Sequence, residues 1–235
     1  MGEPETAVTE REPMKKSIMF QILLTGCLLF LARPGIADQQ ASRVDKILSG
    51  IEKRYAGKGF SAAFFQESML KAMQISDTAE GRLTVKRPGK MRWEYSMPDK
   101  QTIVTDGKSL WIYRPSDNQV MVGKAPDFFG QGKGAGFLSD TRMIRKQFTI
   151  KELPPDNPAY DRLHLTPNKP SEDLAEIILS IKKDIYQVDQ ITTFNAYGDE
   201  TRIVLSDYQF NIDPADSLFT FEIPPGVDVV YMDNP

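Results

Sequence analysis

The sequence predicts a mainly β fold with a few helices: an unclosed antiparallel β-barrel of about eleven strands, covered by an N-terminal helix and a helical lid. Two observations support this fold class. Short segments rich in Val, Ile, Phe, Trp, Tyr and Thr follow one another along most of the chain, with turn residues between them. No helix separates consecutive strands, as the crossovers of a parallel α/β sheet would require.

The composition is that of an ordinary globular protein. Of the 235 residues, 40% are hydrophobic and 26% are charged, and the formal net charge is −3. The basic residues are scattered along the chain instead of forming one cluster. We therefore expect no nucleic-acid partner.

Residues 1–37 are predicted to be a polar N-terminal extension followed by a cleaved signal peptide. Lys15 and Lys16 precede an apolar run over residues 18–32, and residues 35–37 (GIA) fit a small-x-small cleavage site. The apolar run is shorter than the roughly 20 residues that a helix needs to cross a bilayer. We therefore expect export to the periplasm.

Cleavage after Ala37 would leave a single domain over residues 38–235. A signal peptide usually starts at its charged region, so Met14 is an alternative to Met1 as the true start. The only cysteine, Cys27, lies in the apolar run, and the mature chain would then have no disulfide or cysteine metal site. The preceding Leu-Thr-Gly and Cys27 also resemble a lipobox, although the residues that follow remain apolar.

The first predicted element of the mature chain is an amphipathic helix over residues 41–55. Apolar residues recur there at the spacing of one helical face: Val44, Ile47, Leu48, Ile51 and Tyr55. Gly57 and Gly59 end the pattern. Such a stripe needs a larger apolar surface to cover.

Two series of strands follow the helix. The first is predicted over residues 60–70, 80–86, 91–96, 101–105, 109–114 and 119–123. The second is predicted over residues 147–153, 160–166, 176–183, 186–197 and 201–210, with a last short strand over 219–223 before a Pro-Pro-Gly break. Asp106 and Gly107 supply the chemistry of a tight hairpin turn, in which glycine accepts a positive φ.

The stretch between the two series, residues 125–146, has no strand pattern. A glycine-rich run over residues 130–136 precedes apolar residues that suit short helices. Alternate glycines leave the run with little conformational preference, as in a hinge. An apolar, hinged insertion between two halves of a barrel is predicted to form a lid.

The sequence contains no recognisable catalytic set. His164 is the only histidine and lies between two leucines in a predicted strand, without a G-x-S-x-G motif or a second histidine for a metal. Gly130, Gly132 and Ala135 match a degenerate dinucleotide-binding pattern, but the antiparallel surroundings lack a βαβ unit. We therefore expect no enzyme activity, no catalytic residue, no cofactor and no metal site.

Five motifs, taken in order, resemble the periplasmic outer-membrane lipoprotein carrier family, LolA. They are residues 60–66 (FSAAFFQ), 81–88 (GRLTVKRP), 92–95 (RWEY), 106–113 (DGKSLWIY) and 219–227 (FTFEIPPGV). No single motif is diagnostic, but their order and spacing cover most of the mature chain.

The resemblance implies a lidded apolar cavity that takes the acyl chains of a lipoprotein. It also implies an inner-membrane ABC complex that loads the carrier and an outer-membrane receptor, LolB, that accepts the lipoprotein. In the family, the arginine of the Lys-Arg-Pro motif bonds to the lid backbone and holds the empty cavity shut, and that position here is Arg87. A guanidinium suits such a latch because it offers five donors in a fixed fork.

We assign the acyl-chain cavity to apolar and aromatic residues of the strands and the lid. They are Phe64, Met91, Trp93, Tyr95, Trp111, Phe128, Phe129, Phe137, Leu138 and Ile144. Flexible methionines suit a surface that accepts varied apolar shapes. Met91 stands where the family often has an aromatic residue. We expect the carrier to be a monomer.

Three other functions remain open from the sequence alone. A LolB-like receptor shares the fold but is itself a lipoprotein, so lipidation of Cys27 would favour it. An exported lipid-binding scaffold would bind free lipid instead of acylated protein. A secreted hydrolase using surface carboxylates is the third, although carboxylate pairs at turns are weak support for it.

Overall fold

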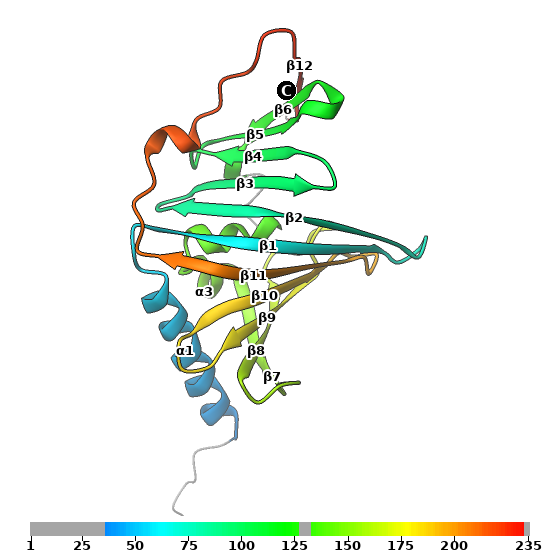
Figure 1. The fold of residues 1–235 in the computed structure, drawn as a ribbon. Helices are drawn as coiled ribbons and strands as arrows, with labels where there is room; N and C mark the ends of the chain where they lie inside the picture. Colours follow the sequence, from blue (N-terminus) through cyan, green and yellow to red (C-terminus); the bar gives the residue numbers. More distant parts are fainter. Residues whose placement is uncertain (1–35, 127–132, 233–235) are drawn as a thin grey trace, which may run out of the picture. The chain divides into compact units, whose positions relative to one another are not determined.

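A computed structural model describes residues 36–126 and 133–232, and its main element is one twelve-stranded sheet (Figure 1). The first six strands are β1 (Gly59–Leu70), β2 (Ile75–Lys86), β3 (Lys90–Met97), β4 (Gln101–Thr105), β5 (Ser109–Arg114) and β6 (Gln119–Lys124). The other six are β7 (Phe148–Leu153), β8 (Tyr160–Pro167), β9 (Glu176–Lys182), β10 (Gln187–Phe194), β11 (Glu200–Phe210) and β12 (Asp228–Tyr231). The predicted fold class is confirmed.

Strands β1 to β6 form one meander and β7 to β11 a second, and the two meet where β1 pairs with β11. The order across the sheet is β12-β6-β5-β4-β3-β2-β1-β11-β10-β9-β8-β7. Neighbouring strands are antiparallel except β12 and β6, which are parallel. Because β12 and β7 do not pair with each other in the described part of the chain, the sheet is unclosed.

The connection from β6 to β7 has to cross the sheet, because these two strands lie toward its opposite edges. Its described part contains a 3-10 segment, η2 (Lys133–Ser139), and helix α3 (Met143–Gln147). In Figure 1 this green part of the chain lies behind the middle strands of the sheet, with α3 labelled below β11. We refer to residues 133–147 as the lid.

The pairing register divides the strand side chains between two faces of the sheet. Leu83, Trp93, Ile103 and Ile112 are aligned directly across β2 to β5, so they lie on the same face. This face carries the main buried cluster, which also contains helix and lid residues, and we call it the inner face. Trp111 lies between Ile112 and the preceding inner residue, so it belongs to the opposite, outer face.

Helix α1 (Ile36–Arg54) covers the inner face on the side of β7 to β11. It begins before the predicted residue 41, and its buried stripe is the predicted one: Ile47, Leu48, Ile51 and Tyr55, with Val44 partly buried. Burying each such side chain contributes about 1.5–3 kcal/mol. Arg43 adds ion pairs from its Nε to Glu152 (2.6 Å) and from its Nη2 to Asp161 (2.9 Å) on β7 and β8. Across residues 36–126 and 133–232, no helix combines the length and apolar character needed to span a membrane.

The turn between β4 and β5 has the predicted chemistry. Gly107 adopts a φ of 94°, a conformation that costs glycine little. The Asp106 carboxylate accepts hydrogen bonds from the backbone N–H groups of Lys108 (2.8 Å) and Ser109 (2.7 Å). These bonds fix the register in which β5 returns along β4.

The predicted strand over residues 219–223 is wrong. The chain there contains a 3-10 segment, η3 (Asp216–Phe219), and lies across the outer face: Arg92 donates to the backbone oxygen of Leu218 (3.3 Å). The alternation that resembled a strand instead buries phenylalanines, and Phe221 contacts the outer-face Tyr113 at 5.4 Å between ring centroids. The last strand is β12, beyond the Pro-Pro-Gly break.

Candidate ligand cavity and its lid

The inner face of β1 to β3 presents an aromatic wall. Phe64 lies edge to face with Trp93 (5.0 Å between ring centroids) and with Tyr95 (4.8 Å). The Tyr95 hydroxyl donates to Gln66 (3.1 Å), and burial raises the pKa of Tyr95 to about 12. Met91 is buried farther along the same strand as Trp93. The wall is therefore apolar, with one polar group at its Tyr95 end.

The lid places its own apolar side chains against this wall. Phe137 and Leu138 come from η2 and Ile144 from α3, and all three are buried in the same cluster as Met91 and Trp93. These side chains lie over the aromatic wall. The structure therefore shows the lid in a closed position.

A small cavity remains beneath the lid. It measures about 230 Å³, and its lining includes Met91, Phe137, Met143 and the glycine turns at Gly89 and Gly107. Ligand pockets usually measure about 300–1,000 Å³. This cavity is therefore smaller than the usual ligand pocket.

Arg87 lies in the turn after β2 and contacts the lid. Its Nη2 atom donates to the backbone oxygen of Leu138 at 3.4 Å. Its Nε atom is buried, and no described group accepts a hydrogen bond from it. Burial lowers the pKa of the Arg87 guanidinium, an effect that the nearby Asp140 carboxylate partly opposes. Arg87 is thus a partly buried cation with a long bond to the lid.

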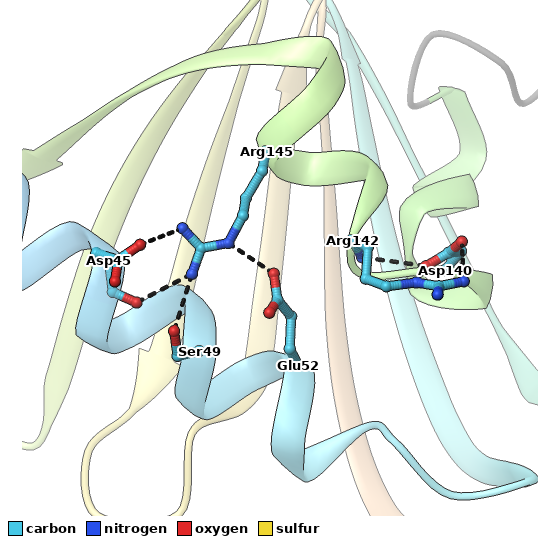
Figure 2. A network of polar contacts seen from close by, with 6 residues as sticks. All are labelled: Asp45, Ser49, Glu52, Asp140, Arg142 and Arg145. Carbon is cyan, nitrogen blue, oxygen red and sulfur yellow. Dashed lines mark hydrogen bonds and ion pairs between the residues drawn. The ribbon is translucent and has the colours of Figure 1, made fainter.

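A second arginine, Arg145 on α3, joins the lid to helix α1 (Figure 2). Its guanidinium forms ion pairs with the carboxylates of Asp45 and, at 2.7 Å, Glu52. It also donates to the Ser49 hydroxyl (2.9 Å) and to the backbone oxygen of Asp45 (3.1 Å). We call these four residues the Arg145 cluster.

The turn between η2 and α3 has a local ion pair of its own. Arg142 donates to both carboxylate oxygens of Asp140, at 2.8 and 2.9 Å, as Figure 2 shows. The hydrogen bond from the Arg142 side chain lowers the pKa of Asp140. This pair holds the turn together, and the Glu52 carboxylate of α1 acts on Arg142 only through a weaker electrostatic interaction.

The structure brings most of the predicted cavity residues together, but not all of them. Phe64, Met91, Trp93, Phe137, Leu138 and Ile144 share one buried cluster, and Tyr95 packs against it. Trp111 lies on the outer face, opposite to Trp93, because consecutive residues of β5 alternate between faces. Phe128 and Phe129 lie outside the described residues.

Sequence reasoning missed the Arg145 cluster. Arg145 is one of several basic residues in a short apolar segment, and its partners lie in a helix far earlier in the chain. Periodicity identifies the apolar stripe of that helix but does not say which charged residues flank a later insertion. Only the tertiary arrangement reveals the contact.

The described polar residues do not form a metal centre. Within residues 36–126 and 133–232, no group of three or more His, Cys, Asp or Glu side chains is placed to hold an ion. His164 lies on the outer side of β8, where its Nε2 atom is 2.5 Å from Glu176. This cross-strand pair accounts for the only histidine.

Comparison with known proteins identifies the family of this chain. The family model described as outer membrane lipoprotein carrier protein LolA matches residues 56–222. The outer-membrane lipoprotein carrier protein of Neisseria gonorrhoeae is 29% identical, with 92% of this chain and 99% of that protein aligned. The corresponding protein of Chromobacterium violaceum is 33% identical over 83% of this chain and 90% of its own length.

A solved structure of an uncharacterized conserved protein from Thermus thermophilus shares the fold, with a TM-score of 0.52 at 14% identity. The matched region covers 80% of this chain and 99% of the Thermus thermophilus chain. The family match extends from the end of α1 through η3, and so includes the aromatic wall, Arg87 and the lid. This chain therefore belongs to the LolA family of outer membrane lipoprotein carrier proteins.

Proposed function

We propose that this chain carries lipoproteins across the periplasm by holding their acyl chains against the inner face. It would receive them from an inner-membrane ABC releasing complex and deliver them to an outer-membrane receptor. Residues 1–37 would be the N-terminal extension and the signal peptide, removed after Ala37, and residues 38–235 the monomeric carrier domain. The observation that carries this proposal is an aromatic wall covered by a lid that offers apolar side chains of its own.

Delivery requires that the acyl chains be held incompletely. Burying a methylene contributes about 0.8 kcal/mol, so one fully enclosed chain of roughly sixteen carbons would contribute about 12 kcal/mol. A lipoprotein with three such chains would not leave on a useful timescale. Return of Phe137 and Leu138 to the wall re-buries apolar surface in the empty carrier, and so offsets part of the loss at release.

We assign the cavity to Phe64, Met91, Trp93, Tyr95, Phe137, Leu138 and Ile144, with Arg87 as the latch. Closure of the lid brings the Arg87 donor to the Leu138 carbonyl. The family relatives named as lipoprotein carriers, and the share of the chain that they cover, support the carrier function but not the individual residues. Trp111 is left out because it lies on the outer face.

The proposal is tested by releasing lipoproteins from spheroplasts. Chain purified from cells that export it is added to spheroplasts, and the medium is examined for soluble complexes by native mass spectrometry. We expect one carrier chain bound to one acylated lipoprotein. Free lipid in place of acylated protein would support the lipid-binding scaffold instead, and an acylated N-terminal Cys27 on the chain itself would support the receptor.

A further inference from the structure

We propose that only one part of the lid moves when acyl chains bind, and that Arg145 determines which part. Arg145 holds α3 on α1 as a fixed base, whereas η2 is the flap that the acyl chains displace. This inference rests on the proposed carrier function, and it deepens it. Arg145 would be a positioning residue, because it acts through α3 and does not touch the acyl chains.

The base of the lid is held by polar contacts. The guanidinium of Arg145 reaches two carboxylates, one hydroxyl and one backbone oxygen, all on α1. The Arg145 and Glu52 side chains are 33% and 30% exposed, whereas the Asp45 side chain is 66% exposed, so the pair with Glu52 is the better shielded of the two from water. A planar guanidinium can make several such bonds at once without losing much further side-chain freedom. Figure 2 shows Arg145 between Asp45 and Glu52, facing α1.

The flap is held mainly by apolar contacts. Phe137 and Leu138 are buried against the wall. The bond from Arg87 to the backbone oxygen of Leu138 measures 3.4 Å, which is longer than the usual 2.7–3.2 Å range for such bonds. The Ser139 hydroxyl bonds to Gly136 within η2 itself, so this bond can move with the flap.

An acyl chain can replace one set of contacts but not the other. It offers apolar surface, and so it can take the places of Phe137 and Leu138 on the wall at little net cost. It offers no charge, and so it cannot replace the ion pairs of Arg145. Displacing Ile144 would also move α3 and break those pairs. Incoming chains should therefore lift η2 and leave α3 in place.

The surroundings of Arg87 also favour a mobile η2 and a fixed α3. When η2 leaves, the buried Nε atom of Arg87 becomes accessible to water, which relieves its missing hydrogen bond. The turn between η2 and α3 is held by the bidentate ion pair of Arg142 with Asp140. This turn can therefore keep its shape while η2 moves. We place the pivot at this turn.

Hydrogen exchange measured by mass spectrometry on the full exported chain tests the inference. The variants are Arg145→Gln and, as matched control, Lys146→Gln, which removes one positive charge from an exposed position of the same helix, outside the Arg145 cluster and the pivot turn. Each is measured empty and with a synthetic triacylated lipopeptide. In the unmodified chain, the lipopeptide should speed exchange in η2 and leave exchange in α3 unchanged.

Arg145→Gln should speed exchange in α3 roughly fivefold or more even in the empty chain, as expected when about 1 kcal/mol of local stabilisation is lost. With lipopeptide, α3 should then open together with η2, whereas Lys146→Gln should behave like the unmodified chain. Opening of α3 together with η2 in the unmodified chain would overturn the inference, and so would equal effects of the two variants. A lipopeptide that does not bind at all would overturn the proposed function, while the empty-chain comparison would still decide the role of Arg145.

Discussion

At the scale of single residues, two arginines that contact the lid, Arg87 and Arg145, have opposite surroundings. Arg87 is partly buried, with one long bond to the lid and a buried Nε atom that has no hydrogen-bond partner among the described groups. Arg145 makes ion pairs with two carboxylates and bonds to two further oxygens on α1. A single long hydrogen bond contributes little to stability, whereas a guanidinium with several short bonds resists displacement. The latch can therefore be released more easily than the base of the lid.

Arg87→Leu should leave a folded carrier that accepts lipoproteins but transfers them poorly. The leucine removes the Arg87–Leu138 bond that would hold the lid over the empty wall, so release should slow, while thermal stability should hold because this bond is long and weak. Transfer from purified carrier–lipoprotein complexes to outer-membrane vesicles measures the effect. Arg82→Leu on the outer side of β2 is the control, and normal transfer by Arg87→Leu would remove the latch from this account.

Residue alternation in the sequence predicted most of the wall but not which face would be covered. Trp93 and Trp111 are both flanked by apolar residues in predicted strands, and both were assigned to the cavity. The register places them on opposite faces. A period of two separates the faces of one strand, but the choice of covered face depends on where the helix and the lid return.

At the scale of elements, the chain after β11 acts as a strap over the outer face. Asp213 and Asp216 form ion pairs with lysines on and beside β2, among them Lys86 at 3.1 and 3.0 Å. Phe219 follows and is fully buried. The strap ends in β12, which extends the sheet beside β6. It therefore supports the wall from behind and leaves the inner face to α1 and the lid.

Phe219→Ala should destabilise the protein by about 3–5 kcal/mol, as expected for removing a fully buried phenylalanine. Leu218→Ala is the matched control, because Leu218 is the neighbouring residue and is 42% exposed. Its hydrogen bond from Arg92 involves only its backbone oxygen, which the substitution keeps. Urea unfolding followed by circular dichroism gives both free energies. Equal small losses for the two variants would show that the strap is not anchored by Phe219.

The strap also shows why element prediction succeeded for eleven strands and failed for one. Strands β1 to β11 carry β-branched and aromatic residues between clear turn signals, and these local features suffice. Residues 219–223 show the same alternation, but Phe219 and Phe221 pack onto the outer face of the sheet instead of forming a strand of it. Strand β12 is short and follows two prolines, so its parallel pairing with β6 has no local signal.

At the scale of the whole fold, the lid follows from topology. Two meanders meet at β1 and β11, which leaves β6 and β7 toward opposite edges of one sheet. The segment that joins them must cross a face, and the inner face is the one that the lid residues cover. The same connection thus closes the apolar wall and supplies the side chains that an acyl chain would replace.

The most direct test of the central claim is to find where an acyl chain lies in the complex. A triacylated lipopeptide with a photoreactive diazirine in one acyl chain is bound to the full exported chain, irradiated, and mapped by tandem mass spectrometry. We predict crosslinks to inner-face residues such as Met91 and Trp93, and none to Trp111 on the same sheet. Crosslinks concentrated at Trp111, or on the exposed Met73 between β1 and β2, would contradict an acyl-chain site beneath the lid.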